Sequence, residues 1–249
     1  MFLVYPVSQE QDYYSPAYFT LGIAVVCVVL LAVGVNWQLA FNTGDPSLLT
    51  ACSSNFAHAG WVHLISNMTM FIVLGSVLEG FWRNWAYLAL ILLAGIAGAY
   101  AGLLFHSIPI RQYGASGMVY GLMGAYLVCY PKTKIGLGYL IWMFVFVRAG
   151  VARVPAWLLF SLYVGGDLWA LSWRSGGHVA HYAHVVGFAV GILGAMVAKK
   201  YHLVAEDAGI EFISANTARA KPDLPRPPEI GQVAQGQSDS KVRIESARD

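Results

Sequence analysis

Charged residues are scarce in this chain, and basic residues are absent from its first third. Charged side chains make up only 11% of the 249 residues, against roughly 25% in an ordinary soluble domain. No lysine or arginine precedes Arg83. With 57% hydrophobic residues and a mean hydropathy of +0.57, this deficit excludes a soluble globular protein. It predicts an integral membrane protein that crosses the lipid bilayer several times.

Cysteine is also scarce, and motifs for metal or nucleic-acid binding are missing. Cys27, Cys52 and Cys129 are far apart, so neither a disulfide framework nor a CxxC-type metal site is indicated. The formal net charge of +2 comes without a basic cluster, so nothing points to a nucleic-acid partner. We therefore expect no cofactor, no metal and no nucleic acid. The sequence does not indicate an oligomeric state.

Six apolar runs have about the length of a helix that crosses a bilayer, which needs about 20 residues. They are 17–35, 61–78, 85–105, 116–130, 154–171 and 180–198. The apolar segment 135–147 is shorter and is expected to be interfacial or re-entrant. We predict an all-α integral membrane protein with an interfacial segment over 1–16 and a six-helix membrane domain over 17–200. A polar tail over 201–249, which holds four of the ten prolines, is expected to be disordered.

The basic residues that border these runs predict the orientation of the chain. Six crossings place both termini on one side, and seven lysines and arginines fall on that side against two, Arg111 and Arg174, on the other. The seven are Arg83, Lys132, Lys134, Arg148, Arg153, Lys199 and Lys200. Because cytoplasmic loops carry the excess of positive charge, both termini are predicted to be cytoplasmic, in a cell (inner) membrane. Ser116 and His184 then lie near the outer ends of two helices.

Ser116 and His184 are the main candidates for chemistry. Taken alone, Ser116 could cap exposed N–H groups at a helix start, and His184 could be a buried histidine whose hydrogen bonds are satisfied. Each, however, adjoins a stripe of small residues spaced by four, which allows two helices to approach closely. The stripes are Gly117, Gly121 and Ala125, and Ala183, Gly187, Gly191 and Ala195. A histidine within hydrogen-bond reach activates a serine hydroxyl, so the pair predicts a nucleophile and its base.

A polar group formed by His58, His63 and Asn67 lies at the start of the second run. His63 and Asn67 are four residues apart and therefore share one helix face. Their N–H groups, with the backbone N–H of Ser116, are suitable donors for a developing oxyanion. The alternative is a buried polar cluster that ties the helix to the preceding loop. For His58 this structural role is the preferred interpretation.

Three further residues lie near these candidates. Tyr120, one helical turn after Ser116, could stack on the His184 ring or simply fill the core. Asp167 is an ionisable group inside a predicted span, where such groups are costly and usually functional. It could orient a histidine, but a position facing the outer interface is the preferred interpretation. His181, one turn before His184, has no assigned role.

Three motifs in this order resemble those of the rhomboid family of intramembrane serine proteases. They are His58-x4-His63-x3-Asn67, Gly114-Ala115-Ser116-Gly117 and Ala183-His184-x2-Gly187. The six-helix layout is also similar, and the stretch Val154-Pro155-Ala156-Trp157 looks like bacterial members. The loop after the first run departs from the family because it lacks the common Trp-Arg pair.

The resemblance implies a rhomboid-like six-helix bundle and a serine endopeptidase. Ser116 and His184 would form a catalytic dyad without a carboxylate third member, and Tyr120 would stack on His184. The oxyanion and substrate-binding site would involve His63, Asn67 and Gly114. The implied substrates are transmembrane proteins, cleaved in or near the bilayer at a segment whose helix is destabilised.

Three other interpretations compete with this one. A channel or transporter is possible for any six-span chain, but no internal repeat supports it. A non-catalytic rhomboid-like protein would bind membrane clients without cutting them, but such proteins usually lack the serine or the histidine. A metal site could be formed if His58, His63, His181 and His184 converged as imidazole ligands. That site would leave the serine and the asparagine unexplained, and the chain contains no HExxH motif.

Overall fold

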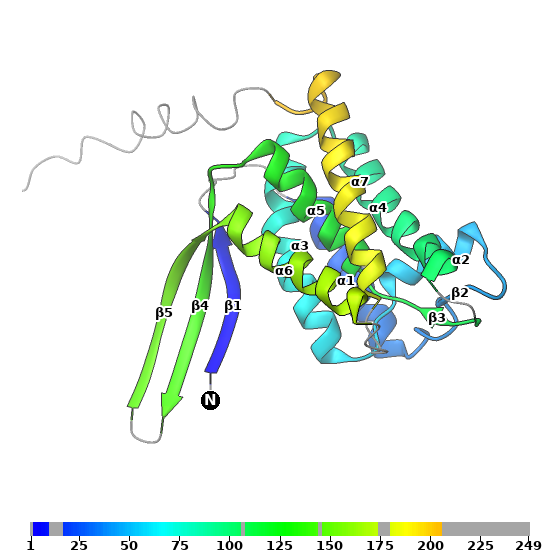
Figure 1. Ribbon diagram of the computed structural model, residues 1–249, viewed down its shortest axis with the longest axis horizontal. Coiled ribbons are helices and arrows are strands. Elements are labelled where there is room, and N and C mark those ends of the chain that lie inside the picture. The colour runs from blue at the N-terminus through cyan, green and yellow to red at the C-terminus, as the bar shows by residue number, and fades with distance from the viewer. Residues whose placement is uncertain (1, 10–16, 106–107, 144–145, 174–179, 206–249) are drawn as a thin grey trace, which may run out of the picture. The chain divides into compact units, whose positions relative to one another are not determined.

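The computed structural model describes residues 2–9, 17–105, 108–143, 146–173 and 180–205 (Figure 1). The chain divides into two compact units, Met1–Gly209 and Ile210–Asp249. Residues 206–249, which include the whole second unit and most of the predicted disordered tail, lie outside the described residues. The fold described below is that of the first unit.

Six apolar helices coincide with the six predicted runs, and each begins and ends within three residues of the predicted bounds. They are α1 (Tyr18–Val33), α3 (Trp61–Phe81), α4 (Asn84–Phe105), α5 (Ser116–Cys129), α6 (Ala156–Ser172) and α7 (His181–Lys200); the short α2 (Leu48–Ser53) and a 3₁₀ turn, η1 (Ser54–Phe56), connect α1 to α3. By length and composition α3, α4 and α7 can cross a membrane, while the apolar α1, α5 and α6 are shorter, at 16, 14 and 17 residues.

A three-stranded sheet corrects the prediction of an all-α protein. The antiparallel strands β1 (Phe2–Gln9), β4 (Lys134–Met143) and β5 (Phe146–Pro155) pair in the order β1-β4-β5. The segments expected to be interfacial, 1–16 and 135–147, therefore contain strands. Hydropathy alone does not separate a short strand from a helix. Residues 134–155 are rich in glycine, which disfavours a helix, and in β-branched and aromatic residues, which favour a strand.

The segment after α7 pairs with the connection between α3 and α4. The backbone N–H of Arg83 donates to Leu203 O at 2.9 Å, and that of Ala205 donates to Phe81 O at 3.0 Å. Val204 forms an antiparallel bridge with Trp82. The predicted start of the disordered tail at residue 201 is therefore too early, because 201–205 are held by these backbone bonds.

Helix α5 is the central helix of the bundle. It contacts α3, α4, α6 and α7, and every residue from Gly117 to Tyr126 is buried. The other five apolar helices each carry exposed large hydrophobic side chains, among them Val25, Ile65, Leu93, Leu162 and Leu193. An apolar exterior of this kind is typical of helices that face lipid. Figure 1 shows α7 running beside α4 and α5.

Glycines let α5 and α7 approach to backbone contact, as the two small-residue stripes predicted. A Cβ added to Gly187 would lie 2.4 Å from the carbonyl oxygen of Gly117, and one added to Gly191 would lie 2.0 Å from that of Gly121. Both distances are too short for a real side chain. The contact brings the start of α5, at Ser116, close to the first turns of α7, which carry His184.

Candidate active site

The loop before α5 is fixed by polar contacts that the sequence analysis did not identify. Strand β2 (Phe41–Asn42) pairs with β3 (Arg111–Gln112). The amide oxygen of Gln112 accepts a hydrogen bond from the hydroxyl of Tyr182 on α7 at 2.5 Å, and its Nε2 donates to Ala99 O on α4. The guanidinium of Arg111 lies 4.7 Å from the centre of the Trp37 ring. These contacts hold the loop just before Gly114 and Ser116.

Gly114 provides space between His63 and Ser116. Its φ angle of +140° lies in a region that favours glycine. A Cβ at this position would lie 2.8 Å from His63 Cε1, 3.1 Å from His63 Nε2 and 4.0 Å from Ser116 Oγ. The backbone N–H of Gly114 donates to Ser54 O at 2.9 Å, which fixes the turn. The serine hydroxyl and the imidazole edge therefore border the same small space beside Gly114.

The hydrogen bonds of His63 determine which of its ring nitrogens can donate. The backbone N–H of Ala59 donates to His63 Nδ1 at 3.3 Å. In a neutral imidazole one nitrogen accepts and the other carries the proton, so Nε2 of His63 is the N–H donor. Because Nε2 is the atom beside Gly114, this donor is suited to stabilise negative charge that develops near Ser116.

His184 is held against Tyr120 on the face of α5 that also carries Ser116. The Tyr120 and His184 rings are stacked, with centroids 4.3 Å apart and planes 11° apart, as the resemblance implied. Ser116 lies four residues before Tyr120 and so shares its face of the helix. Among the described residues no hydrogen bond joins Ser116 Oγ to His184. Catalytic hydrogen bonds are often long in the absence of substrate and tighten when it binds.

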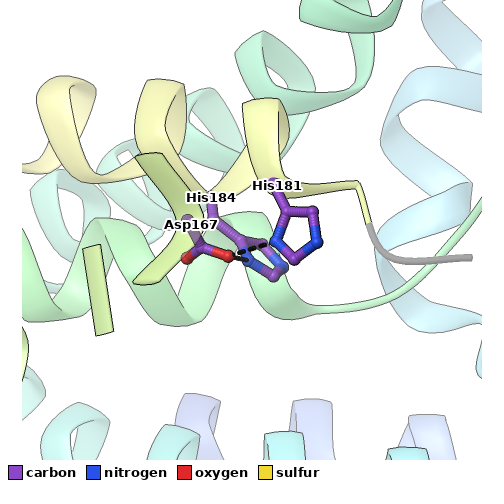
Figure 2. Close-up of side chains that lie close together, drawn as sticks. All are labelled: Asp167, His181 and His184. Atoms are coloured by element: carbon purple, nitrogen blue, oxygen red, sulfur yellow. Dashed lines mark hydrogen bonds and ion pairs between the residues drawn. The ribbon is translucent and has the colours of Figure 1, made fainter. Parts of the chain in front are cut away.

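Asp167 contacts His184, which corrects two expectations: that Asp167 faces the outer interface, and that the dyad has no carboxylate partner. Its side chain, on α6, is buried at 6% exposure. Its Oδ1 lies 3.1 Å from His184 Nδ1 and 2.5 Å from His181 Nδ1 (Figure 2). A carboxylate that accepts the Nδ1–H of His184 leaves Nε2 unprotonated and free to take a proton. The cost of a carboxylate inside a bilayer was the sequence signal that pointed to such partners.

The two other polar residues of α3 and its preceding loop have local contacts. Asn67 is buried, and its Nδ2 donates to His63 O at 3.1 Å within the same helix. The His58 ring makes an edge contact with His63 at 5.2 Å. Apart from a contact with the backbone of Phe56, neither His58 ring nitrogen has a hydrogen-bond partner within the described part of the chain. Burial, and next the neighbouring His63, lower the pKa of His58 to about 4, so its ring is neutral at physiological pH.

The arrangement can support acyl-transfer chemistry. It joins a serine at a helix start, a histidine whose Nδ1 faces a carboxylate, and an imidazole N–H donor on the other side of the serine. The four histidines weighed as one metal site do not form one group. In the described ranges, His181 and His184 cluster with Asp167 instead of with His58 and His63.

Comparison with known proteins agrees with this fold. A family model described as the Rhomboid domain matches residues 45–201, which is more than half of the chain. Rhomboid-related protein 2 from Mus musculus is 32% identical over 143 residues, covering 54% of this chain and 43% of that protein. The match thus spans less than half the length of this curated relative. The family match and the apolar helices together show that the chain belongs to the rhomboid family and is a helical, multi-pass membrane protein.

Proposed function

We propose that this protein is an intramembrane serine protease in which Ser116 is the nucleophile and His184 the general base. The observation that carries the proposal is the environment of His184. Its ring is stacked on Tyr120, one turn from Ser116, and its Nδ1 lies 3.1 Å from the buried carboxylate of Asp167. This environment orients Nε2 as the acceptor, the state in which a histidine can remove a serine proton.

The proposed reaction has two steps. His184 Nε2 takes the Ser116 proton as Oγ attacks the substrate carbonyl, and the resulting imidazolium is stabilised by the Asp167 carboxylate. The Nε2–H of His63 and the backbone N–H of Ser116 donate to the oxyanion, and Gly114 leaves room for it. His184 then protonates the leaving amine. Water hydrolyses the acyl-enzyme in the second step, with His184 again acting as base.

The proposed substrates are transmembrane proteins in the surrounding bilayer. A helical segment hides its carbonyl groups in its own hydrogen bonds, so the cleaved bond must lie where the helix unwinds. We propose that all six apolar helices cross the membrane and that both termini are cytoplasmic. The site beside Ser116 and His184 would then open toward the outer surface of a cell membrane.

Labelling with a fluorophosphonate probe tests the activated serine directly. The purified full chain in detergent is expected to be labelled, and the Ser116→Ala and His184→Ala variants are expected to lose the label. Ser172→Ala and His202→Ala serve as matched controls, because Ser172 is the last residue of α6 and His202 follows the end of α7 that is opposite His181 and His184. They should be labelled like the wild type.

Cleavage of a membrane substrate provides the second measurement. A single-span substrate with a helix-destabilised segment, reconstituted with the protein in liposomes, should be cut by the wild type and the controls only. A folded wild-type protein that neither reacts with the probe nor cleaves such substrates would contradict the proposal. That result would favour a non-catalytic rhomboid-like protein that binds membrane clients.

A further inference from the structure

Asp167, His181 and His184 present three ligand atoms to one point. The ligand atoms of this Asp-His-His cluster, one per residue, all lie within 4.8 Å of one another. Figure 2 shows the carboxylate of Asp167, from α6, directed at the Nδ1 edges of both imidazoles, which project from successive turns of α7. The cluster is anchored on two helices and therefore exists before any ligand binds.

The second carboxylate oxygen of Asp167 leaves room for a further contact at this cluster. Oδ2 is buried and makes no hydrogen bond of ordinary geometry among the residues that the structure describes, while the Tyr120 hydroxyl also interacts with the Asp167 carboxylate. A buried carboxylate oxygen without a partner is costly. Rotation of the carboxylate toward the two imidazoles would give this oxygen a partner if a cation lay between them.

The donor set fits a zinc ion. Two imidazole nitrogens and one carboxylate oxygen are common zinc ligands, at about 2.0–2.2 Å from the metal. Tetrahedral geometry then places the donors roughly 3.4 Å apart. The contacts of Asp167 Oδ1 to His181 and His184, 2.5 and 3.1 Å, would lengthen to reach that spacing, and the ligand atoms all start within 4.8 Å of one another. Water would supply the fourth ligand.

The cluster is accessible from one side. The side chain of His181 is 22% exposed, whereas those of Asp167 and His184 are 7% and 11% exposed. An ion would therefore arrive along His181, which lies at the first residue of α7. His181 takes no part in the proposed reaction, so it can be changed without removing a catalytic group.

We propose that Asp167, His181 and His184 form an inhibitory site for Zn²⁺. The inhibition follows from the tautomer of His184 and rests on the proposed protease function. When a metal binds Nδ1 of a neutral imidazole, the ring proton is carried on Nε2. Nε2 then cannot accept the Ser116 proton. The zinc-bound protein would be inactive, and a chelator would restore it.

Metal binding is measured apart from activity. The purified full-length protein is titrated with Co²⁺, whose visible absorption intensifies in a tetrahedral site, and Zn²⁺ is then added. The Ser116→Ala variant should give the same Co²⁺ spectrum as the wild type, because Ser116 is not a ligand. The spectrum should be absent in His181→Ala and retained in His202→Ala. This result stands even if the protein proves not to be a protease.

Inhibition is measured as fluorophosphonate labelling over a range of Zn²⁺ concentrations. His181→Ala should still be labelled in chelator and, relative to its own rate there, should need at least about 10-fold more Zn²⁺ for half-inhibition, because it has lost one of three ligands. His202→Ala should behave as the wild type. Zinc sensitivity that is equal in wild type and His181→Ala, or a wild type without a Co²⁺ spectrum, would overturn the proposal.

Discussion

Among single residues, Asp167 has the most direct influence on the proposed chemistry. The Asp167→Asn variant removes the negative charge beside His184 Nδ1 and keeps the size of the side chain. Hydrogen bonds to charged groups contribute about 1.5–3 kcal/mol, so we expect kcat to fall by roughly 10- to 150-fold. KM should change little, because Asp167 is buried behind the histidine.

Steady-state cleavage of a reconstituted substrate measures both constants. Asp45→Asn is the matched control, because Asp45 is exposed in the loop before α2. A variant with normal kcat and a raised KM would show that Asp167 affects substrate binding and does not position His184.

The sequence indicated that Ser116, Tyr120 and His184 come together because local spacing carries that information. Ser116 and Tyr120 share a helix face through their separation of four, and the small-residue stripes indicate which two helices meet. Asp167 could not be placed in the same way. The rotation of α6 about its axis depends on how it packs against α7, and an apolar helix with few polar residues gives little indication of that rotation.

Among the elements, the contact between α5 and α7 determines whether a site can form. Gly191→Ala would put a Cβ 2.0 Å from the carbonyl oxygen of Gly121 and force the two helices apart. We expect a lower thermal unfolding midpoint and a loss of fluorophosphonate labelling, since a core shift of this kind costs about 1–3 kcal/mol.

Gly22 on α1 is the matched control for this glycine. No atom lies within 4 Å of a Cβ placed there. Alanine favours a helix over glycine by about 1 kcal/mol, so Gly22→Ala should unfold at the same temperature as the wild type or higher. Equal midpoints for both variants would show that the α5–α7 contact tolerates separation.

The helices were easier to predict than the sheet, because a helix is indicated by local sequence whereas a sheet depends on pairing between distant segments. A long apolar run that ends at basic or glycine-containing stretches predicts a helix from local sequence alone. Strand β4 pairs with β1, more than 120 residues earlier in the chain, as well as with its neighbour β5. A pairing of that kind depends on distant partners, which no local pattern in 135–147 reveals.

Across the whole molecule, contacts between distant segments place several helix ends at one level. The carboxylate of Glu79, near the end of α3, accepts hydrogen bonds from the backbone N–H groups of Phe19 and Thr20 at 2.9 and 2.8 Å. The start of α1 therefore lies level with the end of α3. The bridge between Trp82 and Val204 places the end of α7 at the same level. Arg83, Lys199 and Lys200 flank these ends, whereas Ser116 lies at the opposite end with the start of α3.

Cysteine labelling tests the orientation predicted from charge. In a background with the native cysteines replaced, Ile108→Cys lies after α4 and Lys132→Cys after α5, and both native side chains are exposed. The excess of positive charge predicts that Lys132 and its neighbours lie in the cytoplasm. A membrane-impermeant maleimide added to intact cells should therefore label Cys at 108 and leave Cys at 132 unlabelled until the cells are opened. The reverse pattern would place Ser116 and His184 on the cytoplasmic side, and the proposed substrates would then be cut near their cytoplasmic ends.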